Sequence, residues 1–365
     1  MDAAEWLSRR RRGCVVAPAG VGKTRIAAMA LDLVMQRRKQ SCGPMVGVMV
    51  NTREQVDQFM GAFAVFSSIV HDTQHVSVKC AAAEPDWSCF DVLIVDEVHH
   101  LKTAPTWQAA VATCKGAVWG LTATPWGEDE DENLYLREFF GGEFHEISRA
   151  VIADSITTAH VTLHDASDRD IKDEIDAAIA KTMGWRRRFW QGSEGELWGM
   201  VAWQECVKRG IVGNAARNNA AVLLALRHRE ESVLLLVGQI AHGKELCARI
   251  PGSQVCTSKL TPKRRAAMVA GFRDGSIPCL IATSLADEAF DAPIASVLVL
   301  VSGGRNESRT IQRAGRVCRR YPGKDHAVIH DFADLYHPLA AKHSRRRVET
   351  YRSLGYEVRD AGTLV

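Results

Sequence analysis

Short apolar runs alternate with amphipathic stretches along most of this 365-residue chain. Residues 92–95 and 233–237 are continuous apolar runs, and runs of this length are typical of strands buried on both faces. Residues 53–66 instead repeat apolar positions with the period of a helix. Because strands that alternate with helices build parallel sheets with helices on both faces, the pattern predicts an α/β fold.

The alternation occurs in two blocks separated by a region of different character. We therefore predict a first domain over residues 1–140, a linker with a small helical insert over 141–213, and a second domain over 214–365. The further strands that we expect are at residues 14–17, 45–50, 117–121, 279–282, 297–301 and 327–329. The further helices are at residues 173–183, 214–229, 241–250, 261–272 and 308–320.

A glycine-containing turn joins the first strand to a helix that opens with Lys23 and Thr24. Gly20 and Gly22 allow the backbone to approach a phosphate group, and the helix N-terminus adds a partial positive charge. Lys23 can reach the outer phosphates of a triphosphate, and the Thr24 hydroxyl can hold Mg²⁺. This order of strand, loop and helix predicts a nucleoside triphosphate site. The alternative is a chance glycine turn before a helix.

Two carboxylates follow the buried run at residues 92–95. Sites of parallel sheets lie at the carboxyl ends of the strands, so Asp96 stands where a second Mg²⁺ ligand belongs. Glu97 is placed to polarise a water for attack on the γ-phosphate. Thr122 and Thr124, after the next strand, could relay hydrogen bonds from the nucleotide to a neighbouring domain. The alternative for the carboxylates is an acidic turn.

The predicted helix at residues 308–320 is rich in arginine. Arg316 and Arg319 are three positions apart, so we expect them to share one face of that helix. Two guanidinium groups on one face suit a triphosphate supplied by another domain. A basic surface helix is the equally open alternative.

Two other basic stretches have two readings each. The four arginines at residues 9–12 are either a solvated helix end or a contact to phosphate. Residues 185–190 interleave arginines with aromatic residues, and Trp198 and Trp203 follow. These aromatic residues either stack on nucleic-acid bases or pack the core of the helical insert. We favour packing, because a small helical insert needs large side chains to form a core.

The composition narrows the class of protein. Hydrophobic residues make up 46% and charged residues 24% of the chain, and the net charge is +3, so any affinity for nucleic acid must come from local patches. No apolar run approaches the ~18 residues of a membrane span, and the N-terminus lacks the pattern of a signal peptide. The ten cysteines form no C-x-x-C pair. We therefore expect a reduced, cytoplasmic protein without a zinc site or a membrane partner.

Taken in order, these segments resemble the motifs of the superfamily 2 helicases and translocases. The segments, from motif I to motif VI, are residues 17–24, 50–53, 96–99, 122–124, 236–238, 281–293 and 312–319. Ala17 stands where the general phosphate-loop pattern has glycine, and this superfamily uses that form. The spellings Asp-Glu-Val-His-His and Leu-Thr-Ala-Thr-Pro look most like the restriction-enzyme and excision-repair branch, whose members act mostly on DNA.

The chain departs from the family pattern in three places. Ala289 stands where motif V usually has glycine, and no glutamine motif that reads adenine precedes Cys14. The first domain is also short between motif Ia and motif II, which leaves little room for accessory nucleic-acid loops. Separately, the resemblance does not cover the region from about 140 to 213.

The resemblance implies two RecA-like domains in tandem, with ATP and Mg²⁺ bound in the cleft between them. It implies that the phosphates and the metal are held by Ala19, Gly20, Val21, Gly22, Lys23, Thr24 and Asp96, with Asp291 at the ribose. The implied catalytic residues are Glu97, which orients water, and three that approach the γ-phosphate, Gln312, Arg316 and Arg319. The implied nucleic-acid contacts are Arg53 and Thr283, and the implied coupling residues are His99, Thr122, Thr124 and Thr283.

The function that we expect is ATP-dependent movement along a nucleic-acid strand, with DNA as the track. The alternatives are an RNA helicase and an ATP-gated motor subunit or clamp that remodels nucleic acid for a nuclease or a replication or repair partner without unwinding. A phosphate-loop kinase would not need the arginine helix of the second domain. Strand contacts should be to phosphates, so binding should weaken steeply with salt.

Overall fold

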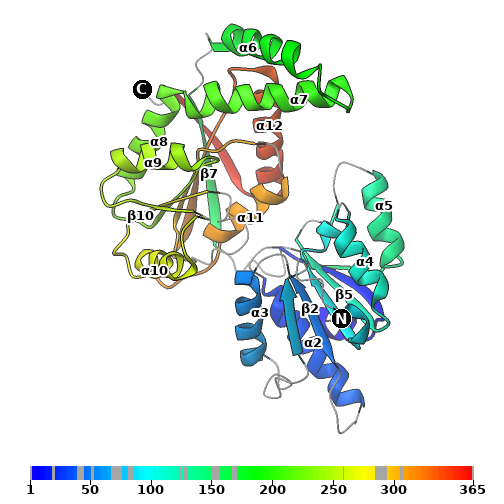
Figure 1. The fold of residues 1–365 in the computed structure, drawn as a ribbon. Coiled ribbons are helices and arrows are strands. Elements are labelled where there is room, and N and C mark those ends of the chain that lie inside the picture. Colours follow the sequence, from blue (N-terminus) through cyan, green and yellow to red (C-terminus); the bar gives the residue numbers. More distant parts are fainter. Residues whose placement is uncertain are drawn as a thin grey trace. The chain divides into compact units, whose positions relative to one another are not determined.

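The computed structural model describes most of the chain. The residues outside the description are 1, 19–20, 39–44, 51–52, 67–75, 81–85, 103, 124, 127–129, 149–156, 167–170, 258, 284–293, 305–306 and 364–365. The chain forms two compact units, Met1–Ser155 and Ile156–Val365 (Figure 1). The domain limits that we expect at residues 140 and 213 stay a prediction.

The first unit is a parallel sheet with helices on its faces. Its strands in chain order are β1 (Arg12–Val16), β2 (Val46–Val50), β3 (Val76–Cys80), β4 (Val92–Asp96), β5 (Ala117–Thr122) and β6 (Phe144–Glu146). Their spatial order is β3-β2-β4-β5-β1-β6. The helices are α1 (Ala3–Ser8), α2 (Lys23–Arg38), α3 (Arg53–Phe66), α4 (Pro105–Thr113) and α5 (Glu130–Phe139), with short 3₁₀ turns η3 (Trp87–Cys89) and η4 (Val98–Lys102).

Both faces of this sheet are buried, which explains the continuous apolar runs. Successive strand residues point to opposite faces, so Leu93 and Val95 pack with Cys14 while Ile94 packs with Val15 in a separate cluster. Burial on both faces removes the polar alternation of a half-exposed strand. The predicted parallel α/β fold is confirmed.

The second unit has its own parallel sheet. Its strands are β7 (Thr158–Asp165), β8 (Val233–Leu236), β9 (Gln254–Cys256), β10 (Cys279–Ala282), β11 (Val297–Leu300), β12 (His326–Phe332) and β13 (Glu357–Thr363), in the spatial order β13-β7-β12-β11-β8-β10-β9. The helices are α6 (Ile171–Arg186), α7 (Glu194–Glu205), α8 (Ala215–Arg227), α9 (Ile240–Arg249), α10 (Pro262–Arg273), α11 (Glu307–Val317) and α12 (Pro338–Ser353). The π-helical segment η6 (Cys206–Val212) follows α7.

The small helical insert is present as α6, α7 and η6. These elements share an apolar cluster that includes Ile175, Leu197 and Tyr336. Strand β7 comes before them in the chain and pairs with β12 and β13, so the sheet of the second unit begins upstream of the insert. The sequence pattern did not predict β7 or β13, because both are rich in polar residues.

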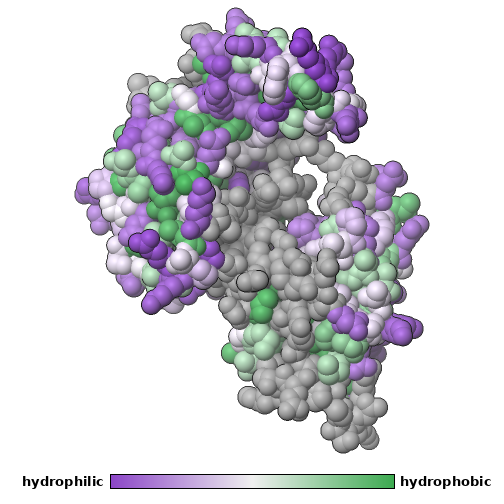
Figure 2. All heavy atoms as spheres, in the orientation of Figure 1, coloured by the Kyte–Doolittle hydropathy of each residue, from purple (hydrophilic) through white to green (hydrophobic). Residues whose placement is uncertain are grey.

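The favoured interpretation of the insert's aromatic residues is wrong for most of them. Trp203 does pack against the insert core, 4.6 Å from the ring of His343. However, Trp185 is 65% and Phe189 75% exposed, and Trp190 and Trp198 are also exposed. The insert core is therefore mostly aliphatic, with Tyr336 as its buried ring, and these four rings are on its outside. Figure 2 shows a largely hydrophilic surface over α6 and α7.

Across the described residues, none of the helices is both long enough and apolar enough to span a bilayer.

Candidate nucleotide site

Three motif segments end at the same edge of the first sheet. Strand β5 lies between β1 and β4, with Val16 opposite Thr122 and Leu121 opposite Asp96. The phosphate loop, the acidic pair and the first threonine of motif III therefore leave the sheet side by side. This is the arrangement that the carboxyl-end rule predicts.

The phosphate loop has the backbone that its glycine requires. Gly22 has a φ of 86°, which is in the left-handed region. A Cβ at this position would meet only the Arg25 Cβ at 3.7 Å, an ordinary contact, so the backbone angle rather than crowding favours glycine there. Helix α2 begins at Lys23, so Thr24 lies in its first turn, where backbone N–H groups have no partner within the helix. The Lys23 Nζ lies 3.5 Å from the Ala17 carbonyl oxygen. Ala19 and Gly20 lie outside the described residues.

Glu97 has an unusual backbone. It follows the last residue of β4 and has a φ of 50°, and it is the one non-glycine residue with a positive φ in the described part of the chain. A non-glycine residue in this region costs about 1 kcal/mol or more, and such strain is concentrated at functional sites. The strain turns the chain sharply at the end of the strand into η4.

The electrostatics of the acidic pair depend on burial and on Lys23. Burial raises the pKa of Asp96 to about 7, the Glu97 charge adds to this, and the Lys23 charge opposes it. Burial would also raise the pKa of Glu97, but the Lys23 charge and the contact with His99 outweigh it and lower the pKa. Two largely buried carboxylates thus share one ammonium group.

This donor set fits Mg²⁺. The Glu97 Oε2 is buried and lies 3.4 Å from His99 Nδ1 without a hydrogen bond. A hard divalent cation prefers carboxylate and hydroxyl oxygens, which Asp96 and Thr24 offer, and its charge would compensate the excess of buried carboxylates. Asp96 and Thr24 are therefore the residues that could hold the metal.

The predicted coupling residues lie on the same side of the sheet. Thr122 is fully buried at the end of β5. The ring centres of His99 and His100 lie 4.5 Å apart, and those of His100 and Trp107 lie 5.0 Å apart, with the rings tilted in both pairs. The acidic pair is thus connected to helix α4 through contacts between rings. Thr124 lies outside the described residues.

The second unit places its motif segments at the carboxyl edge of its own sheet. Thr283 directly follows β10 and is 7% exposed, and α11 follows β11. Gln312 and Arg316 lie on α11, but their side chains are outside the described part of the structure, as is the whole of Asp291. Arg53 opens α3 after β2, and its side chain is not described either.

The predicted position of Arg319 on the arginine helix is wrong. Helix α11 ends at Val317 rather than at residue 320, so Arg319 lies beyond the helix and does not share a helical face with Arg316. The residues after Val317 form the connection to β12, which begins at His326. The role expected of Arg319 at the γ-phosphate stays a prediction.

Comparison with known proteins identifies the family. The model of the helicase conserved C-terminal domain matches residues 216–321, and that of the type III restriction enzyme res subunit matches residues 2–86 and 69–126. The DNA 3'-5' translocase XPB2 of Sulfurisphaera tokodaii is 23% identical over 86% of this chain and 76% of its own length. The DNA 3'-5' helicase XPB of Mycobacterium tuberculosis is 24% identical over 97% of this chain and 63% of its own length.

Solved structures agree on the fold. A fragment of a type I restriction enzyme HsdR subunit from Vibrio vulnificus superposes with a TM-score of 0.67 at 16% identity, covering 99% of this chain and 67% of that one. Dbp5 of S. cerevisiae, bound to RNA and ADP·BeF3, gives 0.61 at 11% identity, covering 96% and 85%. The chain belongs to the superfamily 2 helicases and translocases. Within them it falls in the restriction-enzyme and excision-repair branch, so it is a nucleic-acid-dependent ATPase.

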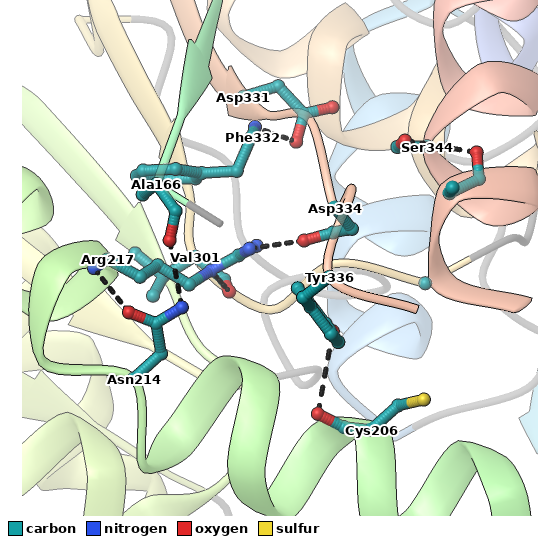
Figure 3. A network of polar contacts seen from close by, with 12 residues as sticks. Ala166, Cys206, Asn214, Arg217, Val301, Asp331, Phe332, Asp334, Tyr336 and Ser344 are labelled. Atoms are coloured by element: carbon teal, nitrogen blue, oxygen red, sulfur yellow. Dashed lines mark hydrogen bonds and ion pairs between the residues drawn. The ribbon is translucent and has the colours of Figure 1, made fainter. Parts of the chain in front are cut away.

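A buried ionic network, which the sequence analysis missed, supports the helicase motif VI helix. Arg347 of α12 donates to Asp331 at 2.8 Å, to Asp334 at 3.0 Å and to the Gly304 carbonyl at 2.6 Å. Arg217 of α8 pairs with the other oxygen of Asp334 and donates to the Val301 carbonyl at 3.0 Å (Figure 3).

The network fixes the segment from which α11 starts. Val301 and Gly304 lie between β11 and α11, and a guanidinium group holds each of their carbonyls. Arg313 of α11 donates to the Ser302 hydroxyl in the same segment at 3.1 Å. The charged members of the network, Arg217, Asp331, Asp334 and Arg347, come from three separate parts of the chain. They were not predicted from the sequence because charged residues are normally assigned to the surface.

Proposed function

We propose that this chain is an ATP-dependent DNA translocase. The observation that carries the proposal is the meeting of the phosphate loop, Lys23 and the strained Glu97 at one sheet edge, in a chain whose second unit is a helicase C-terminal domain. The track is taken to be DNA because the curated relatives are named as DNA translocases and helicases. The chain spans between about half and three quarters of the length of those relatives.

Each residue has a proposed task. Val21 and Gly22, together with Ala19 and Gly20, bind the phosphates through the loop backbone, and Lys23 neutralises the outer phosphates. Thr24 and Asp96 would hold Mg²⁺, which would supply charge compensation on the phosphate oxygens. Glu97 orients the attacking water, and His99 holds Glu97 in place.

The second unit supplies the remaining proposed contacts. Gln312, Arg316 and Arg319 stabilise charge on the γ-phosphate, and an arginine in this role contributes ~10³–10⁵ in rate. Asp291 binds the ribose. Arg53 and Thr283 contact the DNA backbone, and Thr122, Thr124 and Thr283 couple the state of the nucleotide to that contact. The change in grip between the ATP-bound and hydrolysed states moves the protein along the strand.

The exposed end of the insert is a candidate DNA contact. The ring centres of Trp185 and Phe189 lie 5.9 Å apart, and both rings are mostly exposed. The residues between them, 186–188, are arginines, and Arg187 pairs with Glu194. Exposed rings beside guanidinium groups suit stacking on bases together with contact to phosphates. Trp185→Ala should weaken binding of single-stranded DNA about 5- to 160-fold, which corresponds to ~1–3 kcal/mol per stacked base. Leu226→Ala, also at an exposed apolar residue, is the control and should leave the affinity unchanged.

The proposed function is tested by ATPase activity measured in parallel with single-stranded DNA, duplex DNA, branched DNA and RNA. Stimulation by one or more DNA forms above RNA supports the proposal. Stimulation by RNA alone would establish the RNA helicase instead, and a rate that no nucleic acid changes would contradict both.

A further inference from the structure

A basic cavity lies at the edge of the first sheet opposite to the nucleotide site. It has a volume of about 520 Å³ and lies where β1, β4 and β5 begin. Its charged lining residues are Arg9, Arg10, Arg11, Arg37, Lys115 and Asp91. They come from the end of α1, the end of α2 and the residues before the three strands, so the fold gathers them from distant parts of the sequence.

Two of these arginines are already paired. Arg9 forms an ion pair with Glu5, and Arg10 pairs with Glu143 at 2.7 Å while its guanidinium lies 4.2 Å from the centre of the Trp6 ring. These contacts fix the α1 end of the cavity wall. Because each of these guanidinium groups already faces a carboxylate, Arg9 and Arg10 are less available to an anionic ligand.

Arg11 and Arg37 are held by neutral groups only. Arg11 Nη2 donates to the Lys115 carbonyl at 3.0 Å, and Arg37 Nη1 donates to the Ser8 hydroxyl at 3.0 Å. Both are exposed, and among the described residues no carboxylate pairs with either. A guanidinium has five N–H donors, so each retains several donors while its stem is held in position. Asp91, the acidic lining residue, accepts from the Met45 backbone at 2.9 Å.

We propose that this cavity is a second anion site that binds phosphate groups through Arg11, Arg37 and Lys115. Cations gathered this closely repel one another, and a phosphate-bearing ligand would relieve the repulsion with charge-assisted, partly bidentate hydrogen bonds. The volume is within the roughly 300–1,000 Å³ of ligand sites, so it exceeds the need of one phosphate group. The source is either the backbone of a nucleic-acid strand or a free polyphosphate.

The site is separate from the phosphate loop. The loop follows the carboxyl end of β1, whereas the cavity lies at its amino end, and five strand residues span roughly 16 Å. The bound triphosphate therefore cannot reach it. A strand held here would be a DNA contact additional to those of the helicase motifs, and in that form the inference rests on the proposed function.

The direct test is protection of the arginines from phenylglyoxal, read peptide by peptide by mass spectrometry. Wild-type protein is saturated with Mg·ADP to fill the phosphate loop, and then a single-stranded 20-mer or inorganic tripolyphosphate is added. We expect modification of Arg11 and Arg37 to slow at least 5-fold, whereas Arg229, exposed and paired with Glu230, does not change. Protection by the 20-mer alone assigns the site to a strand, and protection by both assigns it to phosphate from either source. Protection by neither overturns the proposal.

A double variant gives an independent measurement. Arg11→Glu with Arg37→Glu should weaken 20-mer binding at least 10-fold, and losing two phosphate contacts should reduce the slope of log Kd against log salt by about 1.4. Arg229→Glu, which changes charge elsewhere, is the matched control, and ATPase without nucleic acid should stay at wild-type level in both. Wild-type affinity and slope in the double variant exclude a nucleic-acid strand as the ligand, and unchanged binding of tripolyphosphate in the same variant contradicts the proposal. The protection assay needs no turnover, so it can succeed even if the translocase function fails.

Discussion

The two units place their chemical groups by different means. In the first unit each functional group follows a strand directly, and the register of β1, β5 and β4 brings Val16, Thr122 and Asp96 together. In the second unit the position of α11 depends on Arg217 and Arg347, which lie far from it in sequence. Local sequence therefore specifies the first site, whereas tertiary packing of buried charges supports the second.

The largest expected effect is at the locally specified site. Lys23→Ala removes the ammonium group that faces both carboxylates, and Glu97→Gln removes the water-orienting carboxylate, so each should abolish ATP turnover. Glu97→Gln should still bind ATP, which equilibrium binding of a fluorescent analogue would measure. Normal turnover in Glu97→Gln would remove the base assignment.

The next effect tests the second unit's contribution to hydrolysis. Arg316→Ala should lower the turnover number by ~10³–10⁵ with little change in nucleotide affinity, because the guanidinium acts on developing charge. Steady-state ATPase and nucleotide binding on the same preparation separate the two quantities. If Arg316→Ala hydrolyses ATP normally, only the first unit carries the chemistry.

The ionic network should act through stability. Removing one partner of a buried ion pair leaves the other charge buried and unpaired. Arg347→Ala leaves Asp331 without its guanidinium partner, so it should lower the free energy of unfolding, measured by urea titration, by ~3–5 kcal/mol. Arg347→Lys keeps the charge and should lose less. Where Arg347→Lys still folds, we expect a lower turnover number with little change in KM, because α11 is less well held. If Arg347→Ala unfolds at the wild-type urea concentration, the network does not support this unit.

Lowering the pH should destabilise the second unit through its buried histidines, at a pH above that at which carboxylates become protonated. Burial lowers the pKa of His330 to about 3 and that of His164 to about 4, and the two rings share a 2.9 Å hydrogen bond. The unfolded chain binds protons at these rings below about pH 6.5, whereas the folded chain does not, so stability is full above pH 6.5 and falls towards pH 4.

One such histidine contributes on the order of 3 kcal/mol over that range. Urea titrations at several pH values should show this slope, and His330→Gln should reduce it. A slope that is the same in His330→Gln would exclude this ring as the source.

The buried strands and the first site could be predicted from sequence, whereas other elements could not. A parallel strand buried on both faces is a continuous apolar run, and Asp96 and Glu97 directly follow such a run. The strand and the site residues could therefore be predicted together. Strands β7 and β13 were missed because they carry His, Thr, Asp and Arg, which suit partly exposed sheet positions as well as loops. The end of α11 was predicted three residues too late. Arg319 and Arg320 follow it closely, and arginine is a good helix former, so the sequence has no stop signal directly after Val317.

Side-chain exposure was the hardest feature to predict. Trp203 and Trp185 are the same residue type in neighbouring helices, yet one packs on the insert core and the other is 65% exposed. The difference comes from tertiary packing, because Trp203 of α7 meets His343 of α12 whereas Trp185 at the end of α6 has no such cover. The basic cavity likewise forms because α1 and α2 end near the residues at which β1, β4 and β5 begin. No local sequence pattern predicts this arrangement.

The central claim is that ATP hydrolysis at the edge containing Lys23 and Glu97 drives movement along DNA. The most direct measurement is displacement of a third strand from a DNA triplex, which requires movement along the duplex but no unwinding of it. We predict ATP-dependent displacement by the wild-type protein and none by Glu97→Gln. Hydrolysis that DNA stimulates but that displaces no third strand, or equal displacement by Glu97→Gln, would contradict the claim.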